Sequence, residues 1–477
     1  MRYLKQSMVR LCLAATSALA LIFTMNSAQA MPSFARQTGM SCNQCHFTHD
    51  NVPNFTIQGM KFRSLGYRIP ERMTKLRAGS PGAEQGETLD IPWWDYLSYR
   101  FESQVLSRSK APGGDTSELS SNPTTRLAWF VVGPVTDHIG FWNEFYILGG
   151  GANNAIGGSG DGGSAWAPGI VSWDEYDLVW TVNPEAIQQN GDVYSIRFTN
   201  QGISETDGFG PGPGGSPSFM GARGSIGGDE HPPTGGFRMT GWMHDQWVWQ
   251  AGIRTGDNNS GWDKKMYEYS AAYFLKNQSD NTMALRLMGQ WGDDEIPYAT
   301  SDSLQTGVNQ NPLVYVYRDV VSGISATRPT GFNTPYLNTD LKKNVAYTPQ
   351  FRWQKADVGP DGSMSWVLDA GYGYGKDTYN DGASFENSAV GATFLYCWMH
   401  TYCAQPTWTH YMTYRFTDYK GTRYNIDRPD SYSVLLIYQP AMNFAVVGSL
   451  SNSTSLSLTG PAKTGGYSYS ITLDFPM

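Results

Sequence analysis

The sequence predicts a mainly β protein, an outer-membrane antiparallel β-barrel of about 16 strands with a small N-terminal segment that plugs it. Three observations support this class. Glycine fills 53 of 477 positions and proline 26, which indicates many short elements joined by turns. Aromatic residues make up 14% of the chain and charged residues 16%, against roughly a quarter charged in ordinary soluble domains. Strand-like alternation of apolar and polar residues recurs from residue 97 to the C-terminus.

Residues 1–30 have the pattern of a secretory signal peptide. A basic start is followed by an apolar stretch from Leu11 to Met25, and Ala28-Gln29-Ala30 fits the small-x-small cleavage rule. An N-terminal anchor helix is the alternative, and the short apolar stretch argues against it. The chain carries a net charge of -8, and removal of this basic segment makes the remainder more acidic. We therefore expect no nucleic-acid partner.

The segment from residue 31 to 86 carries Cys42-Asn43-Gln44-Cys45-His46, the attachment pattern of a c-type haem. The thiols of Cys42 and Cys45 would form thioethers to the vinyl groups, and His46 would be the proximal iron ligand. Two intervening residues let one turn of chain present both sulfurs along one porphyrin edge. A redox disulfide or half a zinc site is the alternative, but the sequence has no second CxxC to complete four zinc ligands. The sequence therefore predicts one covalent haem c.

Three residues are candidates for the sixth iron ligand. Met60 and Met73 have enough intervening chain to return over the opposite face of the haem, whereas His49 lies only three residues past His46. A methionine sulfur stabilises ferrous haem and raises its potential. Met60 is the first candidate, and packing around the porphyrin is the alternative role of any methionine in this segment.

Residues 87–91 form a linker, and residues 92–477 form the predicted barrel. Apolar residues at every second position mark strands near residues 97–105, 194–199, 283–291, 408–416 and 467–475. Sixteen strands would each have roughly 24 residues, enough for about 10 to span the membrane and the rest for turns and loops. A soluble β fold is the alternative, since alternation alone does not identify a membrane.

Tryptophans near strand ends favour the membrane barrel, because amphipathic rings form girdles at both membrane interfaces. These are Trp93, Trp94, Trp142, Trp180, Trp247, Trp249, Trp366 and Trp408. Long polar segments from Gly149 to Gly169, Gly202 to Gly236 and Ser301 to Lys342 are predicted extracellular loops, since such barrels keep short periplasmic turns. We therefore expect outer-membrane lipid around this part of the chain.

A cysteine pair and two acidic clusters each allow a structural and a functional interpretation. Cys397 and Cys403, in an oxidising compartment, are expected to form a disulfide that closes a small loop or hairpin tip, with a metal site using His400 as the alternative. The acidic clusters Asp293-Asp294-Glu295 and Asp229-Glu230 could concentrate a divalent cation, although such clusters are usually solvated loop.

The flanks of the haem motif, Pro32 to Gly39 before it and Pro53 to Tyr67 after it, carry a family resemblance. With the predicted barrel, they resemble the fused monohaem cytochrome-porins of iron-oxidising bacteria, the outer-membrane Fe(II) oxidases. The residue-level likeness covers only Pro32 to Tyr67. It implies an electron-transfer protein that accepts electrons from extracellular Fe(II) through haem c and passes them to a periplasmic c-type cytochrome or cupredoxin, an iron:cytochrome c oxidoreductase.

Three alternatives to that function stay open. They are a diffusion porin with a structural or sensory haem segment, a related barrel cytochrome with another electron donor, and a soluble extracellular β protein with one haem. A 16-stranded barrel leaves a lumen wide enough for a compact plug of some 50 residues. We therefore expect residues 31–86 to fold inside the barrel, with the haem close to the outer mouth.

Overall fold

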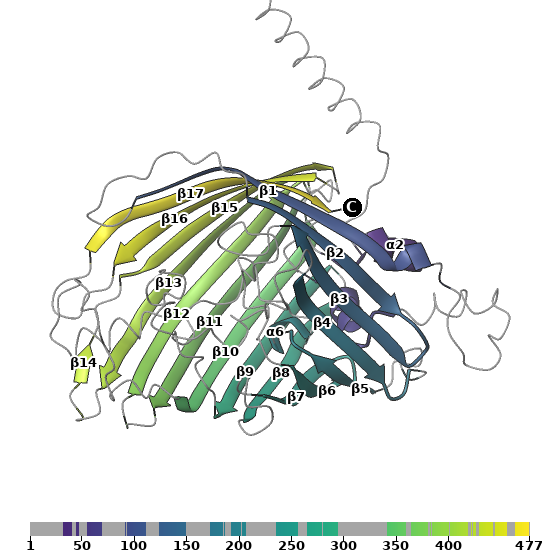
Figure 1. Ribbon diagram of the computed structural model, residues 1–477, viewed down its shortest axis with the longest axis horizontal. Coiled ribbons are helices and arrows are strands. Elements are labelled where there is room, and N and C mark those ends of the chain that lie inside the picture. Colours follow the sequence, from purple (N-terminus) through teal and green to yellow (C-terminus); the bar gives the residue numbers. More distant parts are fainter. Residues whose placement is uncertain are drawn as a thin grey trace, which may run out of the picture.

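In the computed structural model, the protein is a closed antiparallel barrel (Figure 1). The structure describes residues 32–40, 44–46, 55–68, 91, 93–110, 124–148, 172–184, 186, 192–201, 203–206, 235–255, 265–278, 280–293, 341–358, 364–379, 382, 384–399, 401–417, 421, 423–425, 429–441, 444–455 and 463–476.

Among these residues, 17 strands form one sheet. The short β14 (Arg423–Asn425) pairs only with β13, and β13 also pairs directly with β15, so the other sixteen strands make the ring. The ring closes because β1 pairs with both β2 and β17. These strands are β1 (Leu97–Lys110), β2 (Thr124–Pro134), β3 (Ile139–Leu148), β4 (Ser172–Thr181), β5 (Val193–Thr199), β6 (Gly236–Met243), β7 (Trp247–Thr255), β8 (Lys265–Gln278), β9 (Asn281–Gly292), β10 (Leu341–Val358), β11 (Met364–Tyr379), β12 (Ser384–Trp398), β13 (Tyr402–Thr417), β15 (Ser431–Ala441), β16 (Phe444–Ser455) and β17 (Lys463–Pro476).

The two ends of the barrel differ in the length of their connections. At one end, the turn end, β6 and β7 are joined by residues 244–246 and β8 and β9 by residues 279–280. The other end, the loop end, has the longer connections 149–171, 200–235 and 293–340. They include most of the three predicted loops, but Gly236 and Lys342, the last residues of two of these loops, belong to β6 and β10. Short turns are periplasmic in outer-membrane barrels. The turn end is therefore the periplasmic end.

The outer surface of the barrel is apolar, as period-2 patterning requires. On β5 the side chains alternate between buried and more exposed, and Phe198 on the outside is 39% exposed. Other exposed outward side chains include Trp129, Leu178, Trp180, Phe237, Trp247, Leu285, Leu287, Trp291, Phe394, Trp398, Leu436 and Leu450. A closed barrel with an apolar exterior satisfies its backbone internally and faces lipid. The predicted barrel class and the outer-membrane location are confirmed.

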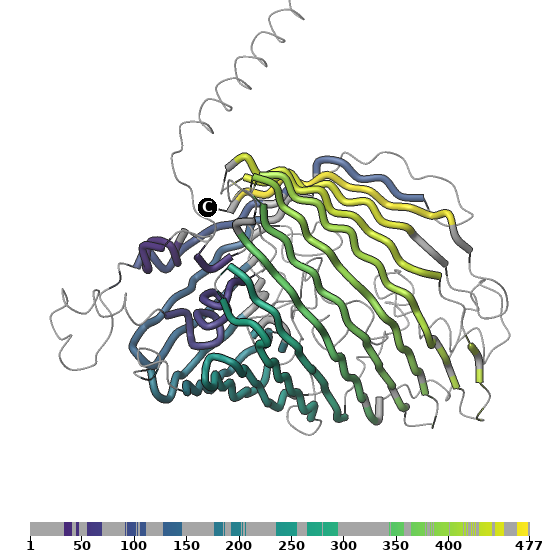
Figure 2. Tube along the Cα trace, turned by 180° about the vertical axis from the view of Figure 1, so that it is seen from behind, coloured from purple at the N-terminus to yellow at the C-terminus, as the bar shows by residue number. Residues whose placement is uncertain are grey.

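The five segments with predicted strand alternation lie in β1, β5, β9, β13 and β17. The described helices are α2 (Pro32–Thr38), α3 (Ile57–Ser64) and α6 (Ile203–Thr206), with a 3-10 turn, η3 (Trp93–Tyr96), before β1. None of the described helices is long and apolar enough to cross a membrane. Figure 2 shows α2 and α3, in purple, against the strands of the first half of the barrel.

Candidate functional site

The plug, as we call residues 32–40, 44–46 and 55–68, contains the described part of the haem motif. Cys45 is a half-buried thiol and His46 a half-buried imidazole. His46 forms an antiparallel bridge with Phe55, and the two ring centroids are 4.9 Å apart. The Phe55 carbonyl accepts a hydrogen bond of 2.8 Å from Gln354 Nε2 of β10. This bond fixes the motif to the barrel wall.

Helix α3 begins directly beneath the motif. Thr56 caps the helix, because its hydroxyl accepts from the Gly59 N–H at 3.2 Å. The same hydroxyl donates to the Gln44 carbonyl at 2.6 Å, and the Thr56 N–H donates to the Cys45 carbonyl at 2.9 Å. A Cβ at Gly59 would lie 2.2 Å from the Cys45 carbonyl oxygen. Only glycine therefore lets helix and motif approach this closely.

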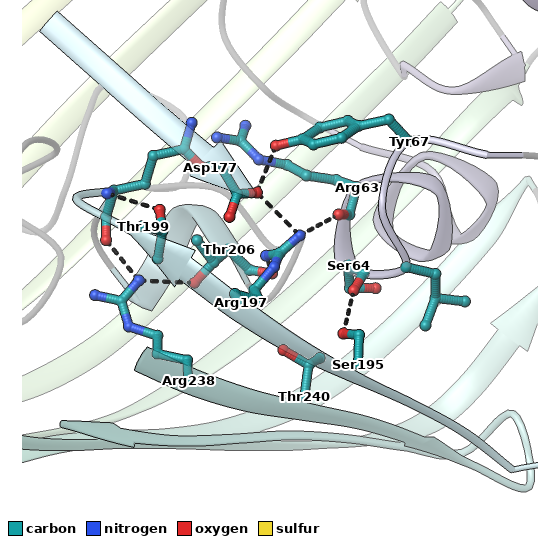
Figure 3. Close-up of polar contacts among 12 residues, drawn as sticks. Arg63, Ser64, Tyr67, Asp177, Ser195, Arg197, Thr199, Thr206, Arg238 and Thr240 are labelled. Carbon is teal, nitrogen blue, oxygen red and sulfur yellow. Dashed lines mark hydrogen bonds and ion pairs between the residues drawn. The ribbon is translucent and has the colours of Figure 1, made fainter. Parts of the chain in front are cut away.

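Polar side chains of β4, β5 and β6 hold the carboxyl end of α3, and Figure 3 shows the contact between Ser195 and Ser64. Ser195 donates to the Ser64 carbonyl at 3.0 Å, and Thr181 donates to the Leu65 carbonyl at 2.9 Å. Trp242 Nε1 donates to the Ser64 hydroxyl. The bonds from Ser195 and Thr181 satisfy backbone carbonyls that a helix leaves open at its end, so the wall itself caps the plug helix.

Arg197 of β5 is the central cation of this contact. Its guanidinium donates to the Arg63 carbonyl of α3, and it lies 3.2 Å from Asp177 Oδ2 of β4. Neither Arg197 nor Asp177 has an exposed side chain. Asp177 also accepts from the Tyr67 hydroxyl at 2.7 Å (Figure 3). Burial, and then the Asp177 carboxylate, raise the pKa of Tyr67 well above its ordinary value, so this hydroxyl stays a hydrogen-bond donor.

The apolar face of α3 packs on the lumen side of β5 to β9. Met60 has no exposed surface. It belongs to a buried cluster with Phe55, Ile57, Leu65, Val193, Trp242, Val248, Ala272, Phe274 and Ala284. The position satisfies one requirement of a thioether ligand, exclusion from water, and it equally suits a packing residue. Met60 stays a prediction as the distal ligand.

Helix α2 packs beside β1, β2 and η3. Gln37 Nε2 donates to the carbonyls of Asp95 and Val132, each at 2.8 Å, and Arg36 pairs with Asp95 at 3.0 Å. Phe34 of α2 packs beside Trp142, which is 9% exposed and contacts the ring of Tyr67. The expectation that Trp142 belongs to a membrane girdle is wrong, because the plug supplies an apolar partner on the lumen side.

Arg68, just after α3, is a buried cation. It is 4% exposed, and its guanidinium has no hydrogen-bond partner among the described residues. Burial lowers its pKa to about 9. An uncompensated buried charge is costly, so this position suits an acidic group that lies against the plug.

The described plug lies at the turn end, not at the outer mouth as we expected for the haem. Lys61 pairs with Asp245 in the turn between β6 and β7. Thr181 and Val193, which contact α3, are the turn-end residues of β4 and β5. The reason is chemical: the polar residues that cap α3 and the apolar residues that cover it are on the wall near the periplasmic turns.

A second luminal layer lies on the loop-end side of α3. Helix α6, from the connection between β5 and β6, turns inward, and Ile203 packs against Met288 of β9, Ala346 of β10 and Ala389 of β12. Thr206 accepts from Arg197 through its carbonyl at 2.6 Å. Arg197 therefore ties α6 to α3.

The luminal wall beside α6 carries a charged cluster. Arg238 and Arg254 both bind the Glu268 carboxylate at 2.7 Å. Arg238 also donates to the Gln201 carbonyl and the Thr206 hydroxyl. Polar side chains of this kind are typical of a barrel interior.

The remaining predicted residues have mixed outcomes. Cys397 and Cys403 form a disulfide across the hairpin of β12 and β13, with Cα atoms 4.1 Å apart. Cys42, His49, Met73 and His400 lie outside the described residues, as do the signal segment and the acidic clusters except Asp293. In the described part of the chain, no group of three or more His, Cys, Asp or Glu residues could hold a metal ion.

Arg197, Asp177 and Gly59 belong to the site but are not among the residues that the sequence predicts for it. Arg197 was visible only as one polar position in an alternating strand, and alternation does not distinguish a solvated luminal side chain from one that holds a plug. A signal was available on β5, where Ser195, Arg197 and Thr199 give three successive polar positions on one face.

Comparisons with known proteins match barrel structures. No family model and no curated protein matches the sequence. The structure is similar to OmpT of Vibrio cholerae, with 10% identity and TM-score 0.45, over 80% of this chain and 97% of that one. It is also similar to the channel DcaP of Acinetobacter baumannii, with 10% identity and TM-score 0.40 over 80% and 96%. A mutant Rh. blastica porin has 8% identity and TM-score 0.42 over 80% and 99%.

Proposed function

We propose that this outer-membrane barrel is an electron-transfer protein whose plug carries one covalent haem c. The observation that carries the proposal is the position of Cys45 and His46, which lie side by side on a segment pinned to the luminal wall through Phe55 and α3. A redox centre that exchanges electrons across a membrane needs to be held inside the barrier. A plug fixed in the lumen meets that need.

The residues present fit a haem. Cys45 supplies a thiol and His46 an imidazole, the donor set that a c-type haem uses. Arg68 supplies a buried guanidinium without a described partner, which suits an acidic propionate. When bound, the haem would supply a one-electron couple. Cys42 and Cys45 would attach it, and His46 would hold its iron.

The other residues of the plug position this donor set. Gly59 brings α3 against the Cys45 carbonyl, and Thr56 ties Gln44 to the helix. Arg197 and Ser195 hold the far end of α3 to β5. Because the motif is anchored at both sides, His46 keeps a fixed orientation during electron transfer, which lowers the structural change that each transfer requires.

Fe(II) outside the cell is the proposed electron donor, by the family resemblance. One electron leaves Fe(II), giving Fe(III), and one electron reduces an oxidised periplasmic c-type cytochrome or cupredoxin. The turn-end plug favours exchange with such a periplasmic carrier. It also requires that the donor, or its electron, cross the part of the lumen beside α6.

Anaerobic addition of Fe(II) to purified full-length protein tests this proposal. We expect the haem absorbance to change from ferric to ferrous, and oxidised carrier to restore the ferric spectrum. The Cys42→Ala, Cys45→Ala double variant is the control, and it should assemble with normal heat-modifiable gel mobility but carry no covalent haem. Covalent haem that Fe(II) leaves oxidised would favour a different donor, and no covalent haem in the natural protein would defeat the proposal.

A diffusion porin with a structural haem segment is the second candidate. The charged luminal cluster of Arg238, Arg254 and Glu268 favours it, because porin barrels have polar interiors. Single-channel recording separates the two functions. A steady porin-like conductance in haem-loaded protein, unchanged when residues 31–86 are deleted, would favour the porin.

A further inference from the structure

Arg63 of α3 is a buried cation in the apolar part of the plug. It is 8% exposed, and its Cζ atom lies over two aromatic rings, 5.7 Å from the centroid of Phe55 and 5.7 Å from that of Trp142 on β3. Phe55 belongs to the apolar cluster against β5 to β9, and Trp142 belongs to the cluster that includes β2 to β4. The side chain therefore carries a positive charge to the place where the two clusters meet.

This charge lies close to the predicted proximal iron ligand. The ring centroid of His46 is 4.9 Å from that of Phe55, and the two residues form a β-bridge. The ring of Phe55 therefore contacts both the Arg63 guanidinium and the imidazole that would hold the iron. Only this one aromatic side chain connects the cation with the donor set of the haem motif.

The guanidinium is not required for the shape of the plug. A methionine of similar length would fill the same space and contact both rings without the cost of burying a charge. The contact with β5 also does not need the side chain, because it is the Arg63 carbonyl that accepts from Arg197. Since packing and anchoring do not account for a cation at this position, its charge is the property to explain.

A buried cation changes the equilibrium of a nearby redox centre. Oxidation of haem iron adds one positive charge, and a neighbouring positive charge disfavours that step. At an effective dielectric constant of about 20 and a separation of about 10 Å, one unit charge changes a one-electron equilibrium roughly tenfold. Solvent-exposed charges act much more weakly, because water and salt screen them.

We propose that the buried charge of Arg63 raises the reduction potential of the haem. This inference rests on the proposed function and adds to it a residue that acts through its electric field and not by coordination. By favouring the ferrous state, Arg63 makes the haem a better acceptor of electrons from a donor such as Fe(II).

Redox titration of Arg63→Met in full-length, haem-loaded protein tests the inference. We expect the reduction equilibrium to shift about tenfold toward the ferric state, which is 59 mV for a one-electron couple, and the shift to persist in high salt. Arg63→Lys keeps the charge and should shift the equilibrium less than about twofold.

Lys61→Met is the matched control, because it removes a cation from the same helix. The Lys61 side chain is 24% exposed and pairs with Asp245, which is 39% exposed. We expect a shift in the reduction equilibrium of less than about twofold, and added salt should remove it.

Protease resistance of the plug checks that Arg63→Met is folded. If it is not, the comparison of Arg63→Gln with Arg63→Lys takes its place, since both side chains are polar and only lysine is charged. Equal midpoint potentials in the natural protein and the uncharged variant would overturn the inference. An equal loss of potential in Arg63→Lys and the uncharged variant would also overturn it, because charge would then not be the cause.

The outcomes separate this inference from the proposed function. A covalent haem that Fe(II) leaves oxidised, with a potential that still falls in Arg63→Met, would support the role of Arg63 and remove Fe(II) as the donor. Natural protein without covalent haem would overturn the proposed function and this inference with it.

Discussion

The two sides of the lumen at the turn end differ in how they bind. The wall from β4 to β6 offers side chains that meet specific backbone atoms of α3, among them Ser195, Thr181 and Arg197. The wall from β11 to β16 offers aliphatic side chains, a disulfide and the buried polar side chains of Ser365 and Gln405. Directional bonds fix the position of a polypeptide, whereas apolar contacts are not directional. The difference teaches that the wall from β4 to β6 sets where the plug lies.

Substitution of Arg197, the central cation of the contact between plug and wall, should have the largest effect on the attachment of the plug. Arg197→Ala leaves the buried Asp177 carboxylate and the carbonyls of Arg63 and Thr206 without this donor. Removing one partner of a buried ion pair costs about 3–5 kcal/mol. We expect the plug to detach, which proteolysis of the plug and a rise in single-channel conductance would measure.

Arg254→Met is the matched control for Arg197→Ala. It also removes a luminal arginine, but Glu268 keeps its ion pair with Arg238. If Arg254→Met releases the plug as readily as Arg197→Ala, the specific contact with α3 is not what holds the plug.

The apolar contact of α3 with the same wall should come second. Met60→Ala removes a fully buried side chain, at a cost of about 2–5 kcal/mol, and protease resistance of the plug should fall. Met60→Leu conserves volume and should cost under about 1.5 kcal/mol. Leucine has no sulfur, so if Met60 is the distal ligand we expect a lower haem potential with an intact plug. An unchanged ferric spectrum and potential in Met60→Leu would assign Met60 to packing alone.

The half-exposed ion pair of the turn should matter least. Lys61 and Asp245 retain 24% and 39% of their side-chain exposure, and pairs open to solvent contribute about 0–1 kcal/mol. Lys61→Met should leave plug protection within that range, and added salt should reduce the difference further. A loss comparable to that of Arg197→Ala would mean that the turn, rather than β5, anchors the helix.

The barrel was predictable because strand alternation is local. Each residue of β5 reports its own side of the wall, so Tyr194, Ile196 and Phe198 identify the outer face from sequence alone. The plug contacts were not predictable, because Trp142 looks the same whether it faces headgroups or Tyr67. Trp142 faces the lumen because it packs against Tyr67, which is 75 residues away in the chain. No local sequence pattern contains that contact.

The buried apolar side chains inside the turn end of β12 are visible in the sequence. On β12, Phe394, Tyr396 and Trp398 face outward while Leu395 and Cys397 face inward. The strand is therefore apolar on both faces at its turn end, where simple alternation predicts a polar lumen. A break in alternation of this kind indicates a buried surface inside a barrel.

The unequal strand lengths have a consequence for how the protein sits in its bilayer. β5 has 7 residues and β10 has 18, and the short strands lie on the α3 side (Figure 1). At about 3.3 Å per residue, β5 extends about 23 Å before tilt, less than the apolar band of about 25 Å. This hydrophobic mismatch is relieved by local thinning or by tilting of the whole barrel. We therefore expect the membrane to be thinnest beside the plug, where the strands are short. We also expect the barrel axis to tilt toward that side, away from the longer strands.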